Sequence, residues 1–307
     1  MKSDNTERKS SLLATREIGM LILKFAVPAV ISGLVSALYN IVDQIFIGRS
    51  VGLLGNGATN VAFPIVTFCM ALALLLGVGS AANFSLESGR GNGEKAMHIA
   101  GNGLAALVIS GMILCAVVVT FLRPLLNLFG ATPDNLSYAL SYTGITAIGI
   151  PFFIFGTGGS HLIRADGSPK YSMVSIASGA VLNCFLDPLF IFGFDMGIRG
   201  AALATITGQV LSAVLVFLYL LRFKARRFCR SDFKLQGVLL RQIVSLGAAA
   251  CFNQLAMAAV QIVLNNTLRS YGAQSVYGSD IPLACVGVIS KVNVIYISIV
   301  VGISQGC

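Results

Sequence analysis

The stretch ILKFAVPAVISGLVSALYNIVDQIFI, residues 22–47, decides the fold class, because it is long and apolar enough to cross a bilayer as one helix. About 20 apolar residues span the ~30 Å hydrocarbon core of a membrane. Similar runs follow near residues 58–82, 99–122, 136–159, 172–194, 199–221, 243–268 and 281–304. The composition agrees, with 56% hydrophobic and 11% charged residues and a mean hydropathy of +0.84. The sequence predicts an all-α polytopic membrane protein with about eight transmembrane helices.

Positive charge is distributed unevenly between the two sides of the predicted bundle. With a cytoplasmic N-terminus, the inner side carries Lys2, Arg8, Lys9, Arg16, Lys24, Arg90, Lys95, Arg164, Lys170, Arg222, Lys224, Arg226, Arg227, Arg230, Lys234 and Arg241. The outer side carries Arg49, Arg123, Arg199 and Arg269. This bias predicts a multi-pass protein of the cell inner membrane with its N-terminus in the cytoplasm. It also explains the net charge of +9 without a nucleic-acid partner.

The basic segment 222–242 divides the chain into two unequal parts. Residues 1–221 hold six predicted helices, and residues 243–307 hold two. A short match between YNIVDQIFIGRSVG (39–52) and VQIVLNNTLRSYG (260–272) is consistent with a parallel repeat of six-helix lobes. We therefore expect an N-lobe, a cytoplasmic inter-lobe loop and the first two helices of a second lobe. The end of the chain at GISQGC, directly after the eighth run, favours a truncated product.

Only two of the twelve acidic residues, Asp43 and Asp187, fall within predicted spans. Ionisable groups at membrane depth are costly and mark candidate functional sites. Asn183 lies one helical turn before Asp187, and Pro188, which follows it, breaks the helical hydrogen-bond pattern there. Two such carboxylates, with a hydroxyl from Thr205, would bind a proton or a small hard cation. The alternative is that each aspartate merely caps a broken helix near a membrane surface.

Other polar residues inside the spans are candidates for lining a substrate cavity. They are Asn40, Gln44, Gln261, Asn265 and Lys291. The amides of the seventh span could equally join helices to one another, and Lys291 could snorkel to the surface. His98 and His161 are expected to be solvated at helix ends. The sequence shows no phosphate-binding, zinc or nucleophile motif, so we expect neither an enzyme nor a cofactor.

Five segments, in this order and spacing, resemble the multidrug and toxic compound extrusion (MATE) family of transporters. They are FAVPAVISGLVSALYNIVDQIFIGRSVG (25–52), GATNVAFPI (57–65), IRADGSPKYSM (163–173), LNCFLDPLFIF (182–192) and GIRGAALATITGQ (197–209). The resemblance implies twelve helices in two six-helix lobes, of which this chain would contain the first eight. It also implies export of organic, often cationic, compounds in exchange for H+ or Na+. Separately, we expect the protein to be a monomer.

The resemblance further implies which residues couple the ion. In members with an N-lobe site, the matching positions are Asp43, Asn183, Asp187 and Thr205, which would also hold Na+, together with Tyr142. Pro28 matches a proline whose kink is linked to ion-dependent bending in some members. Two rival functions remain: a flippase for lipid-linked saccharides, and a truncated fragment that does not transport.

Overall fold

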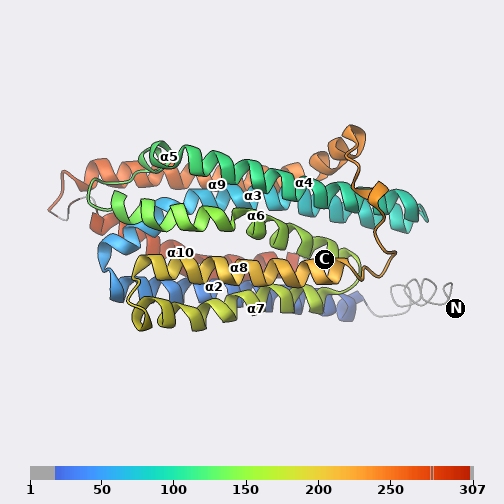
Figure 1. The fold of residues 1–307 in the computed structure, drawn as a ribbon, viewed down its shortest axis with the longest axis horizontal. Coiled ribbons are helices and arrows are strands. Elements are labelled where there is room, and N and C mark those ends of the chain that lie inside the picture. The colour runs from blue at the N-terminus through green and yellow to red at the C-terminus, as the bar shows by residue number, and fades with distance from the viewer. Residues whose placement is uncertain (1–17, 277, 279, 305–307) are drawn as a thin grey trace.

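A computed structural model describes residues 18–276, 278 and 280–304. Eight helices in the described part of the chain are long and apolar enough to cross a membrane, which confirms the predicted fold class. They are α2 (Ile18–Ser50), α3 (Leu53–Gly89), α4 (Gly93–Thr120), α6 (Leu136–Ala165), α7 (Pro169–Pro188), α8 (Ile198–Leu220), α9 (Gly237–Gly272) and α10 (Asp280–Ser304). They run roughly along the long axis of one bundle (Figure 1).

Helices that are neighbours in the chain are not always neighbours in space. The first described helix, α2, packs mainly on α10 and α7 and only lightly on α3. α3 packs on α9, α6 and α4, and α8 packs on α6 and α7. The two helices that follow the basic segment therefore lie directly against helices that precede it, α9 against α3 and α4, and α10 against α2 and α3. Whether the chain divides into lobes at residues 221 and 243 stays a prediction.

Glycines allow several of these helices to approach backbone to backbone. A Cβ atom built on Gly79 of α3 would lie 2.0 Å from the carbonyl oxygen of Ile243 on α9. A Cβ on Gly179 of α7 would lie 2.4 Å from the carbonyl oxygen of Gly208 on α8. Small residues at such contacts are the usual means by which helices associate in lipid, where no hydrophobic effect drives them together.

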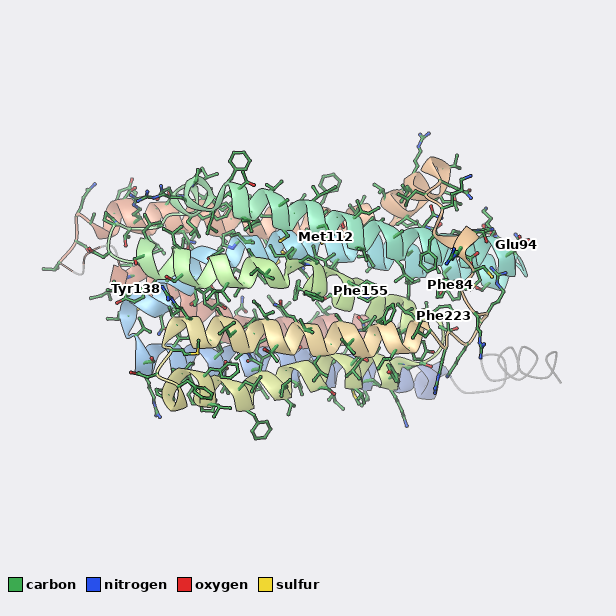
Figure 2. The ribbon with its side chains drawn as sticks, viewed as in Figure 1. Phe84, Glu94, Met112, Tyr138, Phe155 and Phe223 are labelled. Atoms are coloured by element: carbon green, nitrogen blue, oxygen red, sulfur yellow. The ribbon has the colours of Figure 1, made fainter. Side chains whose placement is uncertain are left out.

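Large apolar side chains cover the outer surface of the bundle, as a bilayer requires. On α4 the residues Val108, Ile109, Met112 and Ile113 are all exposed, and Met112 is labelled in Figure 2. At the end of the bundle where α3 finishes, Phe84 and Phe223 lie edge to face, with ring centroids 5.5 Å apart (Figure 2). The bundle thus has an apolar belt and aromatic packing near one end.

Some boundaries differ from those expected. α9 begins at Gly237, not near residue 243, and the connection before it contains a short 3₁₀ helix, η2 (Arg230–Phe233). A seven-residue helix, α5 (Leu122–Leu128), was not predicted. α7 ends at Pro188 and continues as a π-helical turn, η1 (Leu189–Gly193). Pro188 has no N–H to bond the Cys184 carbonyl, which is why the regular α-helix stops there. Pro28 lies inside the continuous helix α2.

Candidate functional site

The buried amide of Asn183 joins α7 to α8 next to Asp187, one of the two carboxylates within the spans. The Asp187 side chain is fully buried and that of Asn183 nearly so. The Asn183 amide fits its neighbours when its nitrogen donates to Asp187 Oδ2 at 3.1 Å and its oxygen accepts the Thr205 backbone N–H at 3.0 Å. Amide orientation is assigned from such a network. Asn183 therefore fixes the position of Asp187 relative to α8.

The second carboxylate reaches the same place from α2. Asp43 is 5% exposed, and it interacts electrostatically with Asp187 and with the phenol of Tyr142 on α6. The Tyr142 and Thr205 side chains hydrogen-bond to each other. The structure thus gathers all five residues expected at an ion site, from α2, α6, α7 and α8. We refer to Asp43, Tyr142, Asn183, Asp187 and Thr205 as the carboxylate cluster.

The chemistry of this cluster suits a small cation or a proton. Two carboxylates removed from water repel one another, so uptake of one positive charge lowers the free energy of the pair. Hard cations prefer oxygen ligands, and Asn183 and Thr205 can add amide and hydroxyl oxygens to those of the carboxylates. Within the described residues no group of three or more His, Cys, Asp or Glu side chains comes together. The carboxylate cluster therefore depends on neutral oxygens as well as on charge.

A cavity of about 410 Å³ lies beside the carboxylate cluster. Its wall includes Tyr39 and Asn40 from α2, Asn183 from α7 and Thr205 from α8, together with residues of α3, α6, α9 and α10. The two aspartates are not part of this wall, so they lie behind it. Asn183 and Thr205 belong both to the cavity wall and to the carboxylate cluster. The cavity and the carboxylate cluster are therefore linked directly by two shared side chains.

Three of the five residues expected in a substrate cavity do not line it. Gln44 borders a separate recess of about 180 Å³ between α2 and α10, where its amide nitrogen donates to the Asn56 side chain. Gln261 and Asn265 lie in a buried hydrogen-bond cluster with Asn60, in which Gln261 Nε2 donates to Asn60 Oδ1 at 3.2 Å. For Gln261 and Asn265 this agrees with the alternative left open by the sequence, that these amides join helices to one another, and a role of the three residues in binding substrate stays a prediction. Asn40 does line the cavity, and the side chain of Lys291 lies outside the described residues.

Sequence reasoning missed part of the cavity wall. Thr157, Ser160, His161 and Arg164 of α6 all line it, and His161 is half-buried, not solvated as expected. Their spacing of three, four and seven residues places them on one face of a helix. That polar stripe was the signal available in the sequence. Gln209 of α8 and Gln254 of α9 complete the polar wall.

Comparison with known proteins agrees with this geometry. The family model MatE matches residues 28–189, which is more than half of the chain and contains Asp43, Tyr142, Asn183 and Asp187. The chain belongs to the MATE family. It is therefore a multi-pass membrane protein of a transport family, not an enzyme, as the sequence indicated.

Similar proteins are multidrug export proteins. The "Multidrug export protein MepA" of Staphylococcus aureus (strain NCTC 8325 / PS 47) is 27% identical to this MATE chain over 254 residues, covering 82% of this chain and 56% of the relative. The protein of the same name from Staphylococcus saprophyticus is 27% identical over 263 residues. This MATE chain thus spans about half the length of the curated relatives that it matches.

Solved structures show the same architecture. The MATE multidrug transporter DinF-BH is 33% identical, with a TM-score of 0.87 over 95% of this chain and 64% of the other. An outward-facing MATE transporter structure shares the fold, with a TM-score of 0.81 at 24% identity. The fold of this chain therefore matches about two thirds of a solved MATE transporter, 64% of its length.

Proposed function

We propose that this chain forms part of a secondary active multidrug exporter, which releases organic, often cationic, compounds in exchange for H+ or Na+. The observation that carries the proposal is that the carboxylate cluster shares Asn183 and Thr205 with the wall of a 410 Å³ cavity. The multidrug export proteins among the relatives support the same interpretation. The coupling ion would bind at Asp43, Asn183, Asp187 and Thr205, next to Tyr142.

The mechanism that follows is alternating access between two lobes. Uptake of an ion by Asp43 and Asp187 removes a repulsion between them, and α2 bends at Pro28 as the cavity releases its substrate. Pro188, directly after Asp187, gives α7 a break at the same depth. One charge moving through 100 mV supplies ~2.3 kcal/mol, which is about a fortyfold change in an equilibrium. An ion can shift the equilibrium only by its difference in affinity for the two states.

The arrangement in the membrane belongs to the same proposal. Residues 1–221 form the N-lobe, 222–242 the cytoplasmic inter-lobe loop, and 243–307 the first part of a C-lobe. The charge bias of the sequence supports an inner-membrane location with the N-terminus in the cytoplasm. We expect one copy of the protein to be the transporting unit.

Ethidium efflux tests the function. Cells would express the 307-residue chain, or the chain extended by the remaining helices of a MATE relative, under imposed H+ or Na+ gradients. Export that Asp43→Asn and Asp187→Asn abolish would support the proposal. The matched control is Asp195→Asn, because Asp195 is exposed and has a φ of 52°, a conformation that asparagine tolerates well. Full export by the Asp43→Asn or the Asp187→Asn variant would overturn the proposal. So would a lack of export by both the 307-residue chain and the extended chain when both are inserted in the membrane.

One observation favours a second candidate, a flippase for lipid-linked saccharides. Arg164 and His161 give the cavity wall a basic group, and the described cavity residues include no Asp or Glu. A basic cavity would suit an anionic lipid-linked sugar. Gradient-dependent ethidium efflux that survives Arg164→Gln would exclude this candidate, whereas lipid scrambling lost in that variant would favour it.

A further inference from the structure

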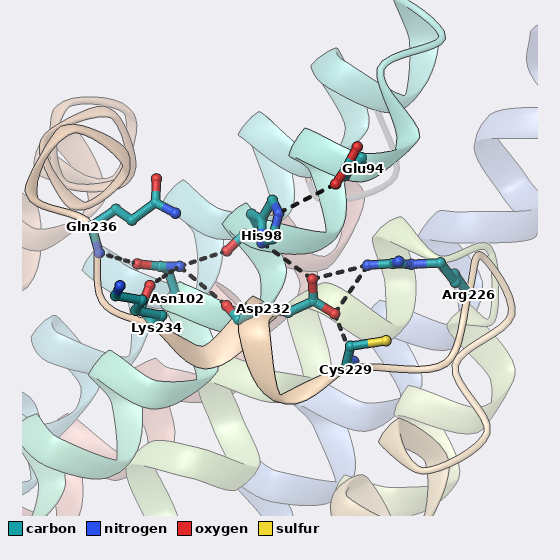
Figure 3. A network of polar contacts seen from close by, with 8 residues as sticks. All are labelled: Glu94, His98, Asn102, Arg226, Cys229, Asp232, Lys234 and Gln236. Carbon is teal, nitrogen blue, oxygen red and sulfur yellow. Dashed lines mark hydrogen bonds and ion pairs between the residues drawn. The ribbon is translucent and has the colours of Figure 1, made fainter.

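A buried carboxylate, Asp232, anchors the later part of the connection between α8 and α9 to the bundle. The Asp232 side chain is fully buried, and Arg226 Nη2 lies 2.9 Å from its Oδ1 and 3.1 Å from its Oδ2 (Figure 3). The Cys229 backbone N–H donates to Oδ2 at 2.7 Å, and His98 Nδ1 of α4 lies 3.2 Å from Oδ1. Asn102 of α4 donates to the backbone carbonyl of Asp232 at 3.2 Å.

A second buried carboxylate holds the beginning of the same connection. Asp166, which follows α6, accepts the backbone N–H groups of Lys224 at 2.8 Å and Ala225 at 3.1 Å, and the Tyr219 hydroxyl at 2.8 Å. Aromatic rings continue the contact, because Phe228 stacks near both Phe223 and Phe233, with centroids 5.0 and 5.4 Å apart. The segment is thus held against the bundle by hydrogen bonds near both of its ends.

The carboxylates that hold this connection, Asp166 and Asp232, are buried against the helices, whereas its basic side chains remain exposed. Arg227, Arg230 and Lys234 are exposed, and none of them pairs with a carboxylate within the described part of the chain. Phe233 and Leu235, which flank Lys234, are also exposed, at 42% and 45%. We call residues 227–235 the basic segment surface. Its side chains combine cationic and apolar groups within nine residues.

The basic segment surface lies at the edge of the membrane-spanning part of the bundle. It follows α8, which ends at Leu220, and precedes α9, which begins at Gly237. In Figure 1 this orange connection lies at the end of the bundle where α3 passes into α4. Short connections between spanning helices remain at the depth of the lipid headgroups. Aromatic and cationic residues are favoured at that depth.

We propose that the basic segment surface binds the headgroups of anionic phospholipids through Arg227, Arg230 and Lys234, with Phe233 and Leu235 entering the interface beside them. Clusters of lysine and arginine next to a spanning helix attract anionic lipid, and each contributes about a fivefold gain in affinity. Phe233 and Leu235 beside these charges suit a lipid interface, where apolar and cationic side chains occur together. Because Asp232 and Asp166 fix the segment, little conformational freedom is lost on binding.

The test uses the purified 307-residue chain in a neutral detergent, titrated with phosphatidylglycerol or phosphatidylcholine and followed by native mass spectrometry. We expect the chain to retain phosphatidylglycerol preferentially. The triple variant Arg227→Gln, Arg230→Gln and Lys234→Gln should weaken that binding at least about tenfold. The matched control, Arg123→Gln, Arg199→Gln and Arg269→Gln, makes the same charge change at the other end of the bundle and should leave it unchanged.

The proposal would be overturned by equal loss in the control variant, by unchanged binding in the triple variant, or by no preference for phosphatidylglycerol. Competition by millimolar inorganic phosphate would also overturn it, because it would indicate a free-anion site. Thermal unfolding of each variant checks the fold. The double variant Arg227→Lys and Arg230→Lys should retain binding, since it keeps the positive charge. Binding should also fall as salt concentration rises.

Discussion

Two buried aspartates in this molecule, Asp187 and Asp232, are equally inaccessible but have different surroundings. Both side chains are fully buried. Both carboxylate oxygens of Asp232 lie near Nη2 of Arg226. The carboxylate also accepts the Cys229 backbone N–H and lies next to His98. Asp187 receives a hydrogen bond from the Asn183 amide, and the charged group that acts on it is another carboxylate, Asp43. Burial alone therefore does not distinguish the two acids, whereas the sign of the charge that acts on each one does.

The first way to break this comparison is Asp187→Asn. If Asp187 binds a mobile cation, the variant should lose gradient-driven efflux by about fortyfold or more, the factor supplied by one charge moving through 100 mV. Its thermal stability should not fall, because a buried charge has been removed without leaving an unpaired partner. Efflux and detergent melting curves measured on the same preparation check both points. Unimpaired efflux would make Asp187 a structural residue like Asp232.

Asp232→Asn should show the opposite pattern. The amide keeps the shape of the side chain but loses charge-assisted bonds, so we expect the anchored connection to lose about 2–3 kcal/mol of local stability. Trypsin should then cleave faster after the exposed Arg227 and Arg230, while efflux changes little. Timed proteolysis of the folded protein measures this. The exposed variant Asp195→Asn serves as the control and should be cleaved at the original rate.

Gly179→Ala tests how far the surroundings of Asp187 depend on the close contact between the α7 and α8 backbones. The added Cβ would lie 2.1 Å from Ser212 Oγ and 2.4 Å from the Gly208 carbonyl oxygen, so α7 must move away from α8. We expect a loss of about 1–2 kcal/mol in stability and a weaker response of efflux to the gradient, because Asn183 and Thr205 separate. Gly93→Ala, at a glycine whose added Cβ meets nothing within 4 Å, is the matched control.

The smallest effect is expected from Tyr142→Phe. This change removes the hydroxyl that bonds Thr205 and leaves both carboxylates in place. One hydrogen bond contributes about 1 kcal/mol, which corresponds to about a fivefold weaker apparent affinity for the coupling ion. Efflux measured against ion concentration should show a shifted midpoint and an unchanged maximum. A lower maximum with an unshifted midpoint would place Tyr142 outside ion binding.

Much of the fold was accessible from the sequence because membrane helices are defined by length and hydropathy. All eight predicted spans overlap the observed helices, and Asp43 and Asp187 stood out because so few carboxylates occur in the spans. The family resemblance, now confirmed, supplied Tyr142 as a fifth position. The role of these residues in ion coupling remains a prediction.

Side-chain contacts between residues far apart in the chain could not be predicted from the sequence in the same way. Nothing local distinguishes an amide that lines a cavity, such as Asn40, from one that joins helices, such as Asn265. Asp166 and Asp232 lie in connections where carboxylates are usually solvated, so their burial depends on contacts made far along the chain. His98 was misjudged for the same reason, since its neighbour Asp232 is more than a hundred residues away.

The double position of Asn183 carries a last consequence. Its amide borders the cavity and also bonds Asp187, so under the proposed function a compound that binds this amide would change how the carboxylates bind the coupling ion. Such coupling is reciprocal by thermodynamic necessity. The factor by which a bound drug alters ion affinity must equal the factor by which the ion alters drug affinity. Two separate titrations, one of each ligand in the presence of the other, must therefore give the same number.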